Sequence, residues 1–273
     1  MSAAGTRLRT AGLLAASCHP GPALAVTVVA ALLAVGVGLS PGRTTLLTAA
    51  VLTGQLSIGW SNDLIDRHRD RRTGRGDKPL AGDTLSPAVV RVACGVALAA
   101  CVVLSLALGA LAGSVHLLGV ACGWAYNLGL KATPWSWLPY AVAFGALAAV
   151  PSLAGGDSVA WWLPVVGALL GVGAHLVNVL PDLDDDAATG VRGLPHRIAA
   201  RSGPAAVTRL AVLLFVTGTA LLLAVVPAGR ARWLAGGLVG VLAVTALRGS
   251  GRTPFRVAIA IALVDVALLA WAV

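Results

Sequence analysis

The sequence predicts an all-α, polytopic membrane protein. Of its 273 residues, 58% are hydrophobic and only 11% are charged, whereas soluble domains carry about 25% charged residues. The mean hydropathy is +0.86, and the apolar residues form continuous runs long enough to cross a bilayer as helices. A transmembrane β-barrel would instead show short segments of alternating hydrophobicity. The composition therefore excludes an ordinary soluble domain, a disordered chain and a fibrous repeat.

Nine apolar runs are each expected to form one transmembrane helix, since a helix needs about 20 apolar residues to cross the hydrocarbon core. They begin near Ala23, Thr44, Ala88, Val115, Ser136, Val159, Pro204, Arg232 and Phe255. The longest polar stretch covers residues 61–83, so we expect a single membrane domain over residues 1–273. Arg7 and Arg9 precede a short apolar stretch at 11–16, which is too short for a cleaved signal peptide.

The basic residues predict the orientation in the membrane. The chain has 20 Lys and Arg against 11 acidic residues, all of them Asp, and a formal net charge of +9. With a cytoplasmic N-terminus and nine spans, 17 of the 20 basic residues lie in cytoplasmic loops. Such an excess is typical of cytoplasmic loops. We therefore expect a bacterial-type cell-membrane protein with its N-terminus in the cytoplasm and its C-terminus outside, and no nucleic-acid partner.

Nine of the eleven aspartates lie in two short segments, at the predicted cytoplasmic ends of the second and sixth spans. In the first segment, Asn62, Asp66 and Asp70 follow one another at intervals of four, and Asp63 lies seven residues before Asp70. In the second, Asp182 and Asp186 are also four residues apart. On an α-helix these intervals place the side chains on one face.

Carboxylates stacked on one helix face repel each other, and a bound cation relieves that repulsion. Mg²⁺ prefers oxygen ligands and often binds through one or two carboxylates together with substrate phosphates. We therefore expect Mg²⁺ ligands at Asp63, Asp66, Asp70, Asp182 and Asp186, with a diphosphate clamped between the two segments. The alternative is that these aspartates are solvated loop charges balanced by arginines. Asp184 and Asp185 fall off the face, and solvation or helix capping is expected for both.

Basic residues follow both segments, and arginine and lysine bind phosphate oxygens well. The candidates for diphosphate binding are Arg71, Arg72, Lys78 and Arg192. Anchoring on the cytoplasmic side is the alternative for each of these four residues. Lys131 is one of only two lysines and lies in a short loop, five residues after Tyr126. For Lys131 we favour a functional role.

Several polar or aromatic residues stand out within or beside the apolar runs. His175 and Asn178 share the predicted face of Asp182, so they either line a cavity or form a hydrogen bond between helices. Trp60 and Trp124 lie near two helix ends, and we favour the membrane interface for both. Asp265, in the last run, has no assigned role.

These motifs resemble those of the UbiA-type intramembrane prenyltransferases. Asn62-Asp63-x-x-Asp66-x-x-x-Asp70 is similar to the family's first motif, and the segment 77–82, Asp-Lys-Pro-Leu-Ala-Gly, to its continuation. The segment from Asp182 to Asp186, followed by Leu194-Pro195, resembles the second motif, and Tyr126 with Lys131 resembles the family's Tyr/Lys pair. Two departures stand out. The Tyr–Lys spacing is one residue longer than usual, and His19-Pro20 stands where many members carry an arginine.

The resemblance implies nine helices around a central cavity that opens to the cytoplasmic side. It also implies Mg²⁺-dependent transfer of a prenyl group from an allylic prenyl diphosphate to a small aromatic acceptor, with no obligate protein partner. The alternative role for Trp60 and Trp124 is then to face the allylic carbocation with their rings. The residues that it places in catalysis are Asp66, Asp182, Lys131 and Tyr126. Asn62 and Asn178 are expected to bind substrate, together with Arg71, Arg72, Lys78 and Arg192. The alternatives are a terpene cyclase of the same family and a transporter, which would carry its ionisable residues nearer the middle of the membrane.

Overall fold

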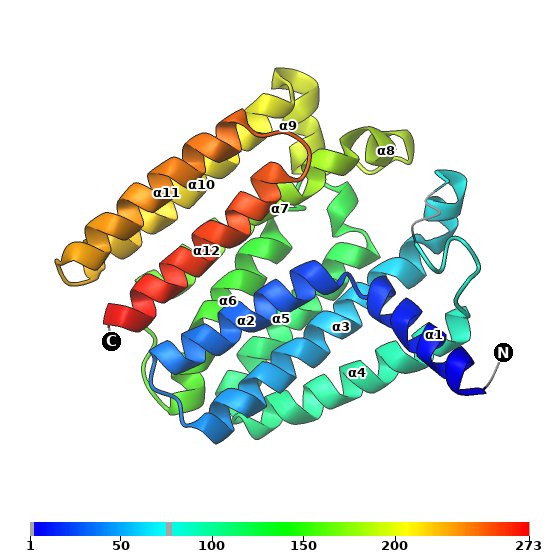
Figure 1. The fold of residues 1–273 in the computed structure, drawn as a ribbon, viewed down its shortest axis with the longest axis horizontal. Helices are drawn as coiled ribbons and strands as arrows, with labels where there is room; N and C mark the ends of the chain where they lie inside the picture. The colour runs from blue at the N-terminus through cyan, green and yellow to red at the C-terminus, as the bar shows by residue number, and fades with distance from the viewer. Residues whose placement is uncertain (1–2, 75–77, 273) are drawn as a thin grey trace.

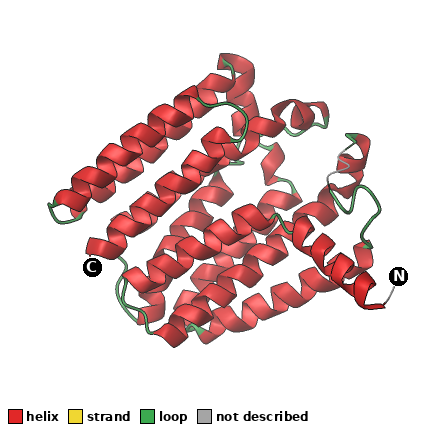
Figure 2. Ribbon diagram, in the orientation of Figure 1, coloured by secondary structure: helices red, strands yellow, loops and turns green. Residues whose placement is uncertain are grey.

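The computed structural model describes residues 3–74 and 78–272, and every regular element in them is helical (Figure 2). The long helices are α2 (Pro20–Gly36), α3 (Pro41–Arg72), α4 (Pro87–Ala107), α5 (Ala110–Leu128), α6 (Leu138–Gly155), α7 (Trp162–Val179), α10 (Pro204–Val225), α11 (Arg230–Arg248) and α12 (Thr253–Ala272). Each begins within a few residues of a predicted start. The shorter elements are α1 (Ala3–Ser17), η1 (Leu130–Ala132), η2 (Leu180–Asp182), α8 (Leu183–Ala188) and α9 (Leu194–Ser202).

The long helices form a closed ring. Each packs against the next one along the chain, and α12 packs against α2, which closes the ring, while the two chain ends lie on opposite sides of the molecule (Figure 1). Contacts between α2 and α6 and between α7 and α12 also cross the ring. We call the end at which α3, α5 and α7 finish the motif end, because both aspartate segments lie there.

Five helices in the described part of the chain are long and apolar enough to cross a membrane: α4, α6, α7 extended through Asp182, α10 and α11. A sixth span is obtained if α1 and α2 count as one bent span. The prediction of apolar membrane helices is thus confirmed, and the number nine stays a prediction. α2 is only 17 residues long, and most of the last ten residues of α3 are charged.

The interior at the end opposite the motifs is filled by apolar side chains. One cluster joins α2, α3 and α6 through Ala30, Leu47 and Val150, among others. A second cluster joins α2, α7, α10 and α12, with Leu33 and Leu222 among its members. These buried contacts hold the ring together at that end.

A sharp bend joins α1 to α2 at the motif end. His19 adopts a left-handed backbone with φ of 55°, and the residue before a proline is in any case disfavoured in the helical region. The axes of the two helices differ by 72°. α1 packs on α3, where the Trp60 indole N–H donates to the carbonyl of Leu14 at 3.0 Å. The bend therefore places His19 beside the first aspartate motif.

Candidate active site

The first motif lies on the last turns of α3, which is helical through Arg72 as predicted. The carboxylates of Asp63, Asp66 and Asp70 are all buried, with relative exposures of 2%, 5% and 4%. Their common face is held against α5, because the Asn127 amide donates to the Ile58 carbonyl and the Ser61 hydroxyl. Buried carboxylates need partners, since an unpaired buried charge is strongly destabilising.

Lys78 supplies one partner from the loop after α3. Its Nζ lies 3.1 Å from Asp63 Oδ1 and 2.9 Å from Asp70 Oδ2, so one ammonium joins two carboxylates seven residues apart. Burial alone would lower the pKa of Lys78, but Asp63 and Asp70 outweigh burial and its pKa is raised. On the other side of Asp63, His19 Nε2 lies 3.1 Å from the same Oδ1 and 3.4 Å from the Asn62 amide nitrogen.

Lys131 supplies the second ammonium. Gly129 ends α5 with φ of 150°, a conformation that residues with a Cβ rarely adopt, and η1 then carries Lys131 back over α3. Its Nζ lies 2.6 Å from both oxygens of Asp66 and 3.4 Å from Asn62 Oδ1. Burial lowers the pKa of Lys131, and the charge of Asp66 offsets this only in part.

Arg69 connects the two motifs. Its guanidinium contacts Asp66 Oδ2 at 2.9 Å and approaches Asp186 Oδ1 at 3.7 Å. Asp186 also has His196 Nε2 at 3.3 Å from its second oxygen. The described structure therefore places carboxylates more than 100 residues apart in sequence at one site. Sequence reasoning missed Arg69 and His196, because a spacer inside a motif and a histidine after it carry no signal of their own.

The backbone of the second motif corrects one prediction. Asp182 and Asp186 were expected on one continuous helix, but α7 ends at Val179, η2 carries Asp182, and α8 begins at Leu183. Pro181 explains the break, since it has no N–H to donate and its ring clashes with the preceding turn. Asp182 and Asp186 are partly buried and Asp185 is exposed, as predicted for the last. The side chain of Asp184 lies outside the described part of the structure.

Three predicted diphosphate ligands are not brought to the buried carboxylates. Arg71 contacts Asp83 and donates to the carbonyl of Ala81 at 3.3 Å, so it fixes the loop after α3. The side chains of Arg72 and Arg192 are exposed at the motif end. Asp77, which the first motif's continuation includes, lies outside the described residues.

An aromatic cluster lies next to the carboxylates. The ring of Tyr126 packs edge-on against Tyr140 and His175, at centroid distances of 5.2 and 5.6 Å. Asn178 lies within hydrogen-bonding reach of the Tyr140 hydroxyl, and His175 Nε2 lies 3.0 Å from Ser136 Oγ. These contacts therefore match the interpretation in which His175 and Asn178 form hydrogen bonds between helical segments, and not the one in which they line a cavity.

The two tryptophans also have defined contacts. The indole of Trp60 is tied to α1, as described above, and that of Trp124 donates to Ser57 Oγ at 3.3 Å. Both indoles therefore bond to neighbouring helices of the bundle.

The donor set suits a hard divalent cation. Carboxylate oxygens are the ligands that Mg²⁺ prefers, and the ammonium of Lys78 shows that a cation is stabilised between Asp63 and Asp70. Among the described residues, no three acidic, histidine or cysteine side chains surround one point. Lys78, Lys131 and Arg69 pair with the carboxylates instead.

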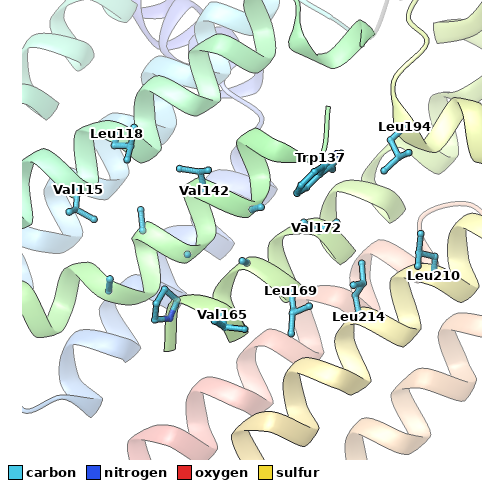
Figure 3. Close-up of a pocket in the computed structure, with 16 residues that line it drawn as sticks. Val115, Leu118, Trp137, Val142, Val165, Leu169, Val172, Leu194, Leu210 and Leu214 are labelled. Atoms are coloured by element: carbon cyan, nitrogen blue, oxygen red, sulfur yellow. The ribbon is translucent and has the colours of Figure 1, made fainter. Parts of the chain in front are cut away.

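An apolar groove of about 790 Å³ runs between α5, α6, α7 and α10 (Figure 3). Val142 and Val172 lie along it, and Trp137 and Leu194 lie at its motif end. It is a candidate place for a hydrocarbon chain. The central cavity expected from the motifs stays a prediction.

The comparisons with known proteins decide the family. The model of the UbiA prenyltransferase family matches residues 23–270, which is most of the chain and includes both motifs. The chain belongs to the UbiA prenyltransferase family. It is therefore an integral membrane protein, in agreement with its apolar helices. No curated protein matches the chain.

Solved UbiA structures share the fold. A UbiA homologue from Archaeoglobus fulgidus bound to GPP and Mg²⁺ is 15% identical, with a TM-score of 0.72 over 94% of this chain and 98% of its own. A UbiA homologue from Aeropyrum pernix K1 is 17% identical, with a TM-score of 0.72 over 89% and 96%. A digeranylgeranylglyceryl phosphate synthase is 15% identical, with a TM-score of 0.68 over 96% and 98%. At these identities the likeness establishes the common fold.

Proposed function

We propose that this UbiA protein transfers a prenyl group from an allylic prenyl diphosphate to a small aromatic acceptor, in a single membrane domain over residues 1–273. One observation carries the proposal. Arg69 contacts Asp66 of the first motif and approaches Asp186 of the second, so both motifs belong to one site at one end of the bundle. The UbiA homologue from Archaeoglobus fulgidus that was solved with GPP and Mg²⁺ supports the same class of donor and metal.

Mg²⁺ is the proposed cofactor, and the residues that would hold it are Asp63, Asp66, Asp70, Asp182 and Asp186. When bound, the metal neutralises the charge of a diphosphate and makes it a better leaving group. The charges of the site also favour a requirement for a bound metal. Asp63, Asp66, Asp70 and Asp186 share only three Lys and Arg side chains in the described structure, so an anionic donor gains little attraction without a metal.

The chain's own cations then bind the diphosphate. Lys131 and Lys78 are already held at the carboxylates and have N–H groups to donate as charge builds on the departing oxygen. The Asn62 amide lies beside Lys131 and orients it. Arg72 and Arg192, exposed at the motif end, attract the donor from water, and Arg71 orders the loop that carries Lys78.

The remaining predicted residues shape the acceptor side. Tyr126 presents a ring edge-on to Tyr140, and Asn178 reaches the Tyr140 hydroxyl. We assign these side chains to packing around the reacting groups, so that they orient these groups and exclude water. An allylic carbocation must be shielded from water, which would otherwise hydrolyse it.

The proposed orientation places the motif end in the cytoplasm. The excess of basic residues in the loops at that end supports it. The N-terminus then lies in the cytoplasm and the C-terminus outside.

The test is acceptor dependence. Purified protein in lipid is incubated with prenyl diphosphates of several lengths, with and without phenolic acceptors, while diphosphate release and products are measured. A prenylated acceptor formed only with Mg²⁺ and acceptor supports the proposal. Diphosphate release with a hydrocarbon product in the absence of acceptor identifies a terpene cyclase. No turnover of any donor refutes both functions.

A further inference from the structure

Ser136 joins three segments that lie far apart in the sequence. It is fully buried in the loop between η1 and α6. Its Oγ lies 3.0 Å from Nε2 of His175 on α7 and 2.9 Å from the backbone nitrogen of Leu194 at the start of α9. Those two partners are 39 and 58 residues away along the chain. We call this three-way contact the Ser136 clip.

The backbone N–H of Leu194 can only donate, so Ser136 Oγ accepts this hydrogen bond. The second hydrogen bond joins Ser136 Oγ to His175 Nε2, and the tautomer of His175 sets which of the two groups donates. In either case one hydroxyl bonds to both partners, which alanine cannot do.

The Ser136 clip lies between the two aspartate motifs. Gly193, next to Leu194, packs so closely that a Cβ there would come within 2.5 Å of the Lys131 carbonyl and 2.8 Å of Ser136 Oγ. The start of α9 therefore rests directly on the loop that presents Lys131 to Asp66.

The same helix start serves the second motif. Two residues after Leu194, His196 Nε2 lies 3.3 Å from Asp186. The segments that the clip joins thus carry a partner of the first motif on one side and a partner of the second motif on the other.

We propose that Ser136 is a positioning residue, whose two hydrogen bonds hold Lys131 in register with the second motif. This inference rests on the proposed prenyl transfer. Ser136 touches neither donor nor acceptor in this view and acts through Lys131. Without its hydroxyl, the Leu194 N–H and His175 Nε2 lose their buried partner, and the start of α9 is free to move relative to η1.

The test combines kinetics with a double-mutant cycle. Ser136→Ala should lower kcat at least tenfold, with KM for the prenyl diphosphate changed less than threefold, and Ser136→Thr, which keeps a hydroxyl, should recover most of the loss. In a Lys131→Ala background, Ser136→Ala should cost less than threefold more, because the residue that it positions is gone. The matched control is Thr133→Ala, whose hydroxyl donates within its own loop to the Leu130 carbonyl; it should stay within threefold of the wild type.

A purely structural serine gives a different pattern. In that case Ser136→Ala would lower kcat by the same factor in the Lys131→Ala background as in the wild type, and this result overturns the proposal. A kcat for Ser136→Ala within threefold of the wild type also overturns it.

Backbone hydrogen exchange separates this proposal from the proposed function. Ser136→Ala should speed exchange of the Leu194 amide whatever the enzyme does, and unchanged exchange overturns the Ser136 clip. If the wild type turns over no prenyl diphosphate, the proposed function is refuted, and so is the catalytic role of Ser136. Hydrogen exchange of the Leu194 amide still shows whether the Ser136 clip exists.

Discussion

Replacing Lys131 by arginine or alanine tests whether its ammonium acts on the diphosphate. Its Nζ lies 2.6 Å from both oxygens of Asp66, and the side chain is only 11% exposed. A guanidinium is wider and planar, whereas an ammonium is a compact charge on a flexible stem. A residue that only marks the cytoplasmic side would tolerate arginine, since both residues carry the same charge. We predict that Lys131→Arg lowers kcat/KM at least tenfold.

The magnitude for Lys131→Ala follows from the loss of one charged donor. Losing a single donor to a developing oxyanion costs about 2–4 kcal/mol, or roughly 30- to 1,000-fold in rate. Stability should suffer less. Removing one partner of a buried ion pair costs about 3–5 kcal/mol when the other is left alone, but Asp66 keeps Arg69 at 2.9 Å. Most of the loss should therefore appear in catalysis and not in folding.

The measurement is kcat/KM for the prenyl diphosphate with purified variants, alongside their thermal midpoints and yields in membranes. Both variants should insert and accumulate like the wild type. Wild-type kcat/KM for Lys131→Arg would refute the reasoning, and the binding of the diphosphate would then have to be assigned to the arginines.

Three further predictions concern the metal, the carboxylates and the topology. A chelator should abolish activity and added Mg²⁺ should restore it, and full turnover in excess chelator would exclude the carboxylate–metal site. Asp66→Ala or Asp182→Ala should each lower kcat by about 10³-fold or more, while Asp184→Ala and Asp185→Ala stay within threefold; an Asp184 variant as impaired as Asp182→Ala would contradict this. Terminal reporter fusions should place the N-terminus inside and Val273 outside, and a cytoplasmic Val273 would require an even number of spans.

The long helices could be located from the sequence because the apolar runs before the last one end in Gly, Pro or charged residues. Starts at Ala88 and Pro204, for example, fall within one residue of α4 and α10. The short helices α1 and α9 were missed, because the apolar stretch of α1 is short and α9 mixes apolar with basic residues, while the residues of α8 were expected as a continuation of the sixth span. Neither α1 nor α9 offers an apolar run of the kind that marks a membrane helix.

For the first motif, the sequence predicted which side chains share one helix face, because the motif lies on one continuous helix. For the second motif it did not, since Pro181 breaks the helix that the spacing assumed. Tertiary partners were harder still. Arg71 was assigned to the diphosphate but folds back on Asp83, while His196 and Ser136 carry no local signal and acquire a role only when α9 packs on the loop after η1.

The central claim is that both aspartate motifs hold one metal–diphosphate group. The most direct measurement is equilibrium binding of geranyl diphosphate to the purified protein as a function of Mg²⁺ concentration, for the wild type, Asp70→Asn and Asp186→Asn. We predict that wild-type binding appears only with Mg²⁺ and that either substitution weakens it at least tenfold. Equal binding in chelator and in Mg²⁺, or loss with only one of the two substitutions, would contradict the claim.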